Sequence, residues 1–250
     1  MQQGQSQKPA YAPPPLADLL TEGRVALFLD FDGTLVELAS GPDAIAPLPD
    51  LGARLKAFAE RLGGACALVS GRAISDIESH LGPLAIAAAG SHGSDIRSAT
   101  RERIGAGPQG LPTAIETELR SFAELEALDY EHKPHGGALH YRKAPEQGPK
   151  AHAFAEALAA EHGWAAQSGK CVVELVAPDA NKGSAVDRFM ADPPFAGARP
   201  IFVGDDITDE AGFAACRAAG GAGILVGEKR ESAAQYHLPD VASVHHWLEL

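Results

Sequence analysis

Short apolar segments alternate with alanine-rich segments along most of the chain. Runs of β-branched and other apolar residues predict strands, and the alanine-rich stretches predict helices. The predicted core strands are residues 25–29, 65–69, 84–89, 200–203 and 223–226. Helices are predicted at residues 49–62 and near residues 74–80. This alternation favours an α/β fold with a doubly wound parallel sheet.

The middle of the chain has a different order of elements, in which a helix followed by two strands occurs twice. The predicted helices are residues 112–125 and 149–162, and the predicted strands are residues 129–133, 138–142, 164–167 and 171–176. Such an order fits a smaller α+β domain inserted into the core. We therefore predict a leader at residues 1–15, a core at residues 16–107 and 180–250, and the inserted domain at residues 108–179.

Composition narrows the class of protein. The leader is rich in Gln and Pro and lacks a basic segment followed by an apolar one, so we expect it to be disordered and not a secretory signal. No apolar run is long enough to span a bilayer. The net charge of −12 argues against nucleic acid or anionic membranes as partners. Three widely spaced cysteines, Cys66, Cys171 and Cys216, favour thiols in a reducing cytoplasm.

Two carboxylates follow the first predicted core strand. In an extended chain Asp30 and Asp32 point to the same side, and Gly33 lets the backbone turn away from them. Two acids that face the same side repel each other unless a cation or a shared proton compensates, which indicates a hard metal ion such as Mg²⁺. Taken alone, the pair is explained more simply as a solvated turn.

Three further polar clusters occur at predicted strand ends or helix starts. They are Ser70-Gly71-Arg72, Asn181-Lys182-Gly183 and the segment 204–210 (GDDITDE). Each by itself fits a turn or a helix cap. Together they supply what phosphoryl transfer requires: a carboxylate nucleophile, an acid for proton transfer, a hydroxyl and a lysine for the phosphoryl oxygens, and ligands for Mg²⁺. Ligands of doubly wound sheets collect at the carboxyl ends of the strands, where we expect all four clusters.

The four clusters, in this order, resemble the haloacid dehalogenase-like phosphatases. The resemblance implies a core of that fold, with Asp30 as nucleophile and Asp32 as general acid and base. It implies that Ser70 and Lys182 bind the phosphoryl group. The implied Mg²⁺ site consists of Asp30, the main-chain carbonyl of Asp32, and Asp205.

Further residues receive roles from the same resemblance. Asp209 is expected to order the metal's waters or Lys182, and Asp206 either binds the metal through a water or anchors the loop. The other residues implied at the substrate site are Gly33, Thr34, Arg72, His92 and Gly93.

Four longer segments are similar to the trehalose-6-phosphate phosphatases. They are residues 89–93 (AGSHG), 137–142 (GALHYR), 169–174 (GKCVVE) and 204–210 (GDDITDE). The resemblance implies Mg²⁺-dependent hydrolysis of trehalose 6-phosphate to trehalose and phosphate, with the inserted domain as a cap that recognises the substrate. We accordingly expect a cytoplasmic monomer that acts on a small-molecule sugar phosphate.

Polar residues of the cap are candidates for binding the sugar. A disaccharide is recognised by polar side chains that converge in a water-poor cleft. Lys133, His140, Arg142 and Glu174 lie on or beside adjoining predicted strands, and alternation puts His140 and Arg142 on one face. We expect Glu174 to accept bonds from sugar hydroxyls, and Lys133 or Arg142 to meet phosphate or hydroxyl oxygens. A solvated sheet face with a structural ion pair is the simpler alternative.

Three other functions are compatible with the clusters. The first is a phosphatase of the same fold for another sugar phosphate, such as sucrose 6-phosphate or a glycosyl-glycerate phosphate. The second is a phosphomutase, in which a bound phosphosugar intercepts the aspartyl-phosphate. The third is a non-catalytic sugar-phosphate sensor, against which the intact Asp30, Asp32, Lys182 and Asp205 argue.

Overall fold

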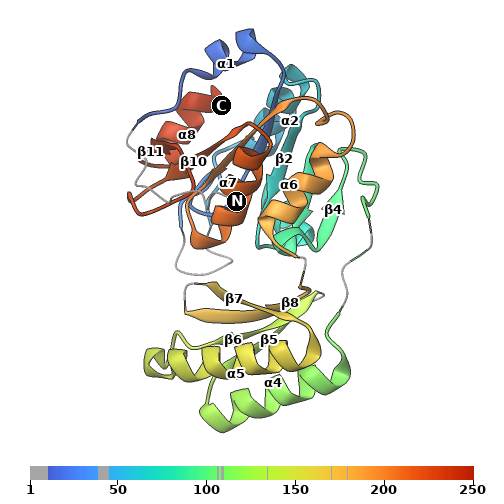
Figure 1. Ribbon diagram of the computed structural model, residues 1–250, viewed down its shortest axis with the longest axis vertical. Coiled ribbons are helices and arrows are strands. Elements are labelled where there is room, and N and C mark those ends of the chain that lie inside the picture. Colours follow the sequence, from blue (N-terminus) through green and yellow to red (C-terminus); the bar gives the residue numbers. More distant parts are fainter. Residues whose placement is uncertain are drawn as a thin grey trace. The chain divides into compact units, whose positions relative to one another are not determined.

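The structure, a computed structural model, describes residues 11–38, 45–105, 107, 110–133, 135–169, 171–178 and 180–250. The chain divides into two compact units (Figure 1). We call Met1–Gly105 together with Asn181–Leu250 the core unit, and Ala106–Ala180 the inserted unit. Residues 1–10 of the predicted leader, the predicted domain boundaries at residues 108 and 179, and Lys170 lie outside the described residues. No helix of the described residues is both long enough and apolar enough to cross a membrane.

A seven-stranded sheet forms the centre of the core unit. Its strand order is β11-β10-β9-β1-β2-β3-β4, and every neighbouring pair is parallel except β3 and β4. The strands are β1 (Val25–Leu29), β2 (Cys66–Val69), β3 (Ala87–Gly90), β4 (Asp95–Arg97), β9 (Arg199–Gly204), β10 (Ala222–Val226) and β11 (Tyr236–Leu238). The predicted α/β class with a doubly wound, mostly parallel sheet is confirmed.

Helices cover both faces of this sheet and bury its apolar side chains. Side chains alternate along β1, so Leu27 and Leu29 enter one hydrophobic cluster while Phe28 enters the other. The first cluster is covered by α1 (Leu16–Glu22), α2 (Leu51–Arg61), α3 (Ile74–Leu81) and α8 (Val241–Leu248). The second is covered by α6 (Lys182–Met190) and α7 (Glu210–Ala218). Because β1 is buried on both sides, its carboxyl end is held rigidly.

The inserted unit has its own antiparallel sheet and its own core. The strand order is β5-β6-β8-β7, with β5 (Asp129–Lys133), β6 (Gly136–His140), β7 (Ala165–Gly169) and β8 (Val172–Val176). Helices α4 (Thr113–Glu126) and α5 (Gly148–His162) pack on one face of this sheet (Figure 1). Leu139 and Val173 point to that face, which leaves the intervening residues of β6 and β8 on the other.

The position of β6 corrects one prediction about the substrate residues. The sequence predicts a strand at residues 138–142, but β6 runs from Gly136 to His140 and pairs with β8 from its first glycine. Tyr141 ends the pairing by donating its N–H to the carbonyl of Cys171, and the chain then turns. Arg142 therefore lies outside the strand, and the alternation argument that placed it beside His140 is wrong.

The described end of the predicted leader is bound to the core unit, which differs from the predicted disorder of residues 1–15. The carbonyl of Tyr11 accepts a hydrogen bond from the N–H of His237 at 2.9 Å. Trp247 donates its indole N–H to the carbonyl of Pro14 at 2.8 Å. These bonds extend the edge of the sheet beyond β11 and tie residues 11–15 to α8.

Candidate active site

Two neighbouring strands bring the first two acids of the site together. Asp30 follows β1 directly, and its N–H donates to the carbonyl of Val203 on β9 at 2.9 Å. Asp205 follows β9, the strand that pairs with β1 in parallel. The Asp30 side chain is buried, with 4% of its surface exposed. Carboxyl ends of parallel strands meet at one edge, and this edge carries both acids.

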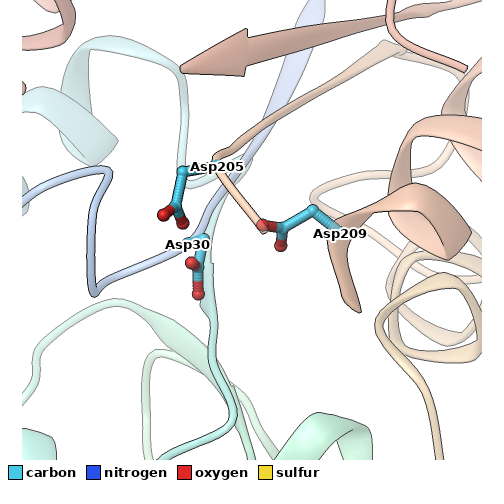
Figure 2. A group of neighbouring side chains, drawn as sticks. All are labelled: Asp30, Asp205 and Asp209. Atoms are coloured by element: carbon cyan, nitrogen blue, oxygen red, sulfur yellow. The ribbon is translucent and has the colours of Figure 1, made fainter. Parts of the chain in front are cut away.

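A third acid completes a compact group. Asp209 lies at the start of α7 and is completely buried. One carboxylate oxygen each of Asp30, Asp205 and Asp209 lies within 4.8 Å of the other two. Figure 2 shows the three side chains as neighbours. The residues come from three separate parts of the sequence, so only the fold assembles them.

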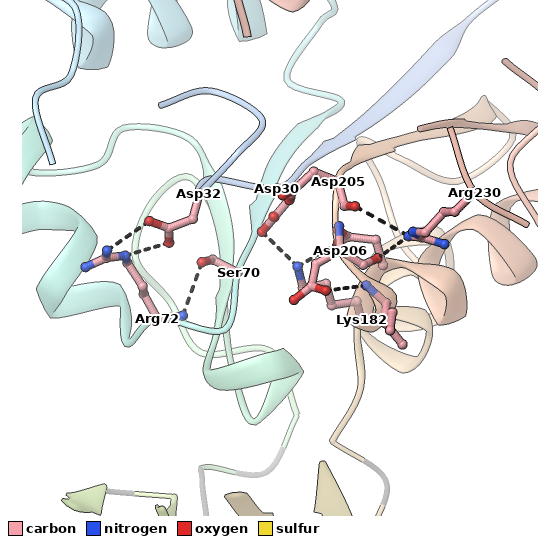
Figure 3. Close-up of polar contacts among 10 residues, drawn as sticks. Asp30, Asp32, Ser70, Arg72, Lys182, Asp205, Asp206 and Arg230 are labelled. Atoms are coloured by element: carbon pink, nitrogen blue, oxygen red, sulfur yellow. Dashed lines mark hydrogen bonds and ion pairs between the residues drawn. The ribbon is translucent and has the colours of Figure 1, made fainter. Parts of the chain in front are cut away.

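Lys182 is the cation that the structure places among these acids. Its Nζ lies 2.8 Å from Oδ1 of Asp30 and 2.6 Å from Oδ1 of Asp209 (Figure 3). The side chain is 3% exposed, so both ion pairs are shielded from water. Asn181 caps α6 by accepting the N–H of Ser184 at 2.9 Å, which fixes Lys182 as the first residue of the helix.

Burial changes the ionisation of the whole group. Desolvation and the nearby Asp209 raise the pKa of Asp30 well above its usual range, although Lys182 opposes this. Desolvation likewise raises the pKa of Asp209, and it raises the pKa of Asp205 to about 7. Burial lowers the pKa of Lys182, but the attraction of Asp209 and Asp30 outweighs this and raises it overall. The ammonium is therefore charged, while the acids gain from any further positive charge.

The donor set fits a divalent metal ion. When all three carboxylates are ionised, the one ammonium leaves two negative charges uncompensated. Carboxylate oxygens are the ligands that Mg²⁺ prefers. Both oxygens of Asp209 already accept hydrogen bonds, one from Lys182 and one from the N–H of Asp206 at 2.9 Å. Asp30 and Asp205 are thus the acids best able to offer oxygens to an ion.

Gly33 leaves room for the Asp205 carboxylate. A Cβ atom on Gly33 would lie 2.1 Å from Oδ2 of Asp205, a distance that no side chain can occupy. The glycine also has a φ of 74°, which other residues rarely adopt. Gly33 therefore permits both the turn after β1 and the close approach of Asp205.

Asp32 does not join the acid group. The chain leaves the extended conformation after β1, because the N–H groups of Leu35 and Val36 both return to the carbonyl of Phe31. The Asp32 carboxylate instead accepts two hydrogen bonds from Arg72, at 2.6 and 2.9 Å (Figure 3). The Asp32 carboxylate is therefore not one of the three that lie within 4.8 Å of one another.

Arg72 contacts protein acids on both sides of its guanidinium group. Besides Asp32, it donates to Asp76 at 2.7 Å. Its main-chain N–H donates to the hydroxyl of Ser70 at 3.1 Å, and Ser70 is 1% exposed. The second predicted cluster thus lies beside the first.

The remaining predicted residues of the core unit pack around the same edge. A Cβ on Gly71 would lie 2.6 Å from the His92 ring, so this imidazole rests on the backbone of the second cluster. A Cβ on Gly93 would lie 2.8 Å from the carbonyl of Asn181. The hydroxyl of Thr34 is buried and has no hydrogen-bond partner among the described residues. The structure therefore brings His92 and Gly93 to the clusters at residues 70–72 and 181–183.

The candidate sugar residues lie on the inserted unit. The strand register sets Glu131, Ala138 and Glu174 in one row across the sheet. Lys133 forms an ion pair with Glu174, and its Nζ lies 3.8 Å from Glu131. His140 lies 2.8 Å from Glu131, so three of the four predicted residues share a polar network.

No role was predicted for Arg230, and Glu210 was predicted only as part of the segment GDDITDE. Arg230 donates to the main-chain carbonyl of Asp206 at 2.7 Å (Figure 3). It also forms an ion pair with Glu210. Glu210 belongs to the segment GDDITDE, but Arg230 lies in a distant loop without a local motif. No signal in the sequence alone links the two.

Comparisons with known proteins agree on one family. A model of the family described as trehalose-phosphatase matches residues 28–242. A probable trehalose-phosphate phosphatase of Sinorhizobium fredii is 40% identical over 205 residues, covering 81% of this chain and 77% of its own. The trehalose-6-phosphate phosphatase of Escherichia coli is 34% identical over 232 residues, covering 91% of this chain and 86% of its own.

A solved structure shows the same fold. The C-terminal domain of the C. albicans trehalose-6-phosphate phosphatase superposes with a TM-score of 0.81, covering 98% of this chain and 99% of that domain. Its sequence identity of 21% supports the fold alone. The family match and the two relatives show that this chain belongs to the trehalose-phosphatase family.

Proposed function

We propose that this protein hydrolyses trehalose 6-phosphate to trehalose and inorganic phosphate. The observation that carries the proposal is the buried Asp30 carboxylate, paired with Lys182 at 2.8 Å beside Asp205, in a chain of this family. A buried carboxylate held by a lysine is suited to act as a nucleophile toward a phosphate monoester.

The reaction would proceed in two displacements. In the first, an oxygen of Asp30 forms a bond to phosphorus, the bond from phosphorus to the sugar oxygen breaks, and Asp32 gives that oxygen a proton. In the second, water attacks phosphorus, Asp32 takes the proton from the water, and the bond to Asp30 breaks to release phosphate. Each oxygen of Asp32 accepts one hydrogen bond from Arg72 and keeps a second lone pair that can hold the proton.

Lys182, Ser70 and Thr34 are proposed to bind the phosphoryl oxygens. Lys182 brings positive charge into a buried position, where its attraction for an anion is strong. The hydroxyl of Thr34 has no partner in the part of the chain that the structure describes, and it can donate to the phosphoryl group. Gly33, Arg72, His92 and Gly93 are proposed to shape the surrounding surface, because they pack against Asp205 and the clusters at residues 70–72 and 181–183.

The family resemblance and the donor set together favour Mg²⁺. Asp30 and Asp205 would hold the ion, together with the main-chain carbonyl of Asp32, and Asp209 would order Lys182. When bound, Mg²⁺ supplies charge that offsets the negative charge of the phosphate and of the acids. Asp206 caps the short helix at residues 207–209 with its own carboxylate, which favours the role of loop anchor over that of a ligand.

We propose the inserted unit as the cap that recognises trehalose. Lys133, His140, Arg142 and Glu174 are its candidate sugar-binding residues, because polar groups on one sheet face match the hydroxyls of a disaccharide. The three free cysteines are consistent with a cytoplasmic location, and we expect a monomer.

The proposal is tested by measuring phosphate release from a panel of sugar phosphates. The panel contains trehalose 6-phosphate, sucrose 6-phosphate, a glycosyl-glycerate phosphate and glucose 6-phosphate, each with Mg²⁺. We expect the highest kcat/KM for trehalose 6-phosphate and a loss of roughly 10³-fold or more in Asp30→Asn. Preference for another substrate would replace the sugar assignment, and isomerised sugar phosphate would indicate a mutase. Binding without release would indicate a sensor.

A further inference from the structure

Arg230 connects three segments of the core unit next to the acid group. It lies in the loop between β10 and β11. Its Nη2 donates to the main-chain carbonyl of Asp206 at 2.7 Å and reaches that of Asp205 at 3.4 Å (Figure 3). Its Nη1 forms an ion pair with Glu210, in the first turn of α7. One guanidinium group thereby joins the loop after β9 to a helix and to its own loop.

Glu210 holds the arginine in place. One oxygen of its carboxylate binds Arg230, and the other accepts the main-chain N–H of Ala233 at 2.7 Å. Both Arg230 and Glu210 are 28% exposed. Partial burial and two further main-chain bonds make this pair more rigid than a solvated surface pair.

The loop that Arg230 holds has little freedom to shift without losing the site. Asp205 packs against Gly33, where even a Cβ atom would lie 2.1 Å from its Oδ2. On the other side, a Cβ on Gly204 would lie 2.3 Å from Cγ of Asp209. The N–H of Asp206 is fixed to Asp209, and Arg230 fixes the carbonyl of the same residue. Both main-chain polar groups of Asp206 are therefore bound.

We propose that Arg230 is a positioning residue that sets the Asp205 loop for binding a divalent cation. The proposal rests on the cation site of the proposed function and adds to it a residue that touches neither the ion nor the substrate. A planar guanidinium spreads its donors over three nitrogens and reaches carbonyls and a carboxylate on different sides, whereas the three donors of a lysine ammonium all lie on one nitrogen. Arg230→Lys should therefore retain only part of the Mg²⁺ affinity of the wild type.

The test is calorimetric titration of Mg²⁺ into the metal-free full-length protein. We expect Arg230→Met to weaken Mg²⁺ binding roughly 10- to 100-fold, as is typical when a partner of a metal-binding residue is lost. Arg230→Lys should lie between this variant and the wild type. The matched control is Arg101→Met, which removes another arginine of the core unit, bound to Glu78 at 2.6 and 2.7 Å, and should bind Mg²⁺ normally.

Kinetics separate positioning from a general structural effect. With trehalose 6-phosphate, Arg230→Met should need more Mg²⁺ for half-maximal activity, while kcat and KM at saturating Mg²⁺ stay near the wild-type values. Wild-type Mg²⁺ affinity in a folded Arg230→Met would overturn the proposal. If circular dichroism shows that Arg230→Met is unfolded, the affinity of Arg230→Lys decides in the same way.

The outcomes for Arg230 and for the proposed function are distinguishable. A wild-type protein that binds Mg²⁺ but releases no phosphate from trehalose 6-phosphate would refute the function and leave the calorimetric test of Arg230 intact. A wild-type protein that binds no Mg²⁺ would overturn the role of Arg230 itself.

Discussion

Lys182 pairs with Asp30 and Asp209 at 2.8 and 2.6 Å in the interior of the core unit, and Asp205 lies beside them. One buried cation cannot neutralise three acids. Desolvation is the largest cause that raises the pKa of each acid, and the excess of negative charge from neighbouring carboxylates adds to it. The same excess makes the group a site for a divalent ion, because the ion compensates the charge that burial disfavours.

The raised pKa of Asp205 predicts that stabilisation by Mg²⁺ depends on pH. Without metal, its pKa is about 7 against an ordinary value of 3.8, so the folded state binds the proton more tightly than the unfolded state. This contribution to stability is present below about pH 4 and is lost as pH rises through about 7. Mg²⁺ competes with that proton. The increase in Tm caused by Mg²⁺ should therefore be larger at pH 8 than at pH 5.

Scanning calorimetry with EDTA or with Mg²⁺ measures this difference. Asp205→Asn is the control, since it cannot ionise and should show a small Mg²⁺ effect at both pH values. An equal Mg²⁺ effect on the wild-type Tm at pH 5 and pH 8 would show that Asp205 does not couple proton and metal binding.

Single residues of the site were predictable to different degrees. Asp30, Lys182 and Asp205 stand at strand ends or helix starts, where topology alone brings side chains to one edge. The direction of the Asp32 side chain was not predictable, because it depends on the turn at Phe31 and on an ion pair with Arg72. Contacts between loops far apart in sequence leave no local pattern.

At the scale of elements, the start of α6 is what delivers Lys182 to the acids. This helix has nine residues, and its capping box binds Asn181 and Ser184 to each other's main chain. A short helix gains a substantial part of its stability from such caps. The direction of Lys182 therefore depends on the cap.

Asn181→Ala should lower both stability and activity. We expect the free energy of unfolding to fall by about 1 kcal/mol, and kcat with trehalose 6-phosphate to fall because Lys182 loses its fixed position. Asp240→Ala is the matched control, since Asp240 caps α8 by accepting the N–H of Ser243 at 2.8 Å. Urea denaturation should give a similar loss in both variants. Equal activity in the two would show that the α6 cap does not position Lys182.

Most elements with buried apolar runs were predictable, and the exceptions have physical causes. β1 is buried at all five positions, and its predicted and observed bounds coincide. β4 and β11 have only three residues each and carry polar side chains, so neither stands out in the sequence. Gly136 and Gly137 join β6 despite weak strand propensity, because pairing with β5 and β8 on both sides holds them.

At the scale of the whole molecule, the protein consists of two units with separate hydrophobic cores. The acids, Lys182 and Arg230 all lie in the core unit, whereas the candidate sugar residues lie in the inserted unit. Fold class and the order of elements were predictable from the alternation of strands and helices. We propose that the core unit carries out the chemistry and that the inserted unit recognises the sugar, and kinetics can test this.

Glu174→Gln should separate recognition from chemistry. Glu174 is 8% exposed and pairs with Lys133, so the substitution removes charge from the polar network without changing its shape much. We expect kcat/KM for trehalose 6-phosphate to fall roughly 10- to 100-fold, the effect of one or two hydrogen bonds to a charged group. Hydrolysis of p-nitrophenyl phosphate, which has no sugar, should be unchanged.

Glu116→Gln serves as the control for this comparison. Glu116 also lies in the inserted unit and bonds Arg120 at 2.7 Å, but it belongs to helix α4 and not to the polar sheet face. Glu116→Gln should leave the hydrolysis of both substrates unchanged. Equal losses for both substrates in Glu174→Gln would mean that the inserted unit acts through stability and not through sugar recognition.

The central claim is that Asp30 itself accepts the phosphoryl group, and capturing that intermediate tests it most directly. The protein is mixed with trehalose 6-phosphate and Mg²⁺, stopped with acid within the turnover time, and treated with borohydride, which reduces an acyl phosphate to an alcohol. Mass spectrometry of the peptide containing residues 25–35 should then find homoserine in place of aspartate at position 30. The account would be contradicted if phosphate were released steadily while position 30 remained aspartate and the reduced residue were found elsewhere in the chain.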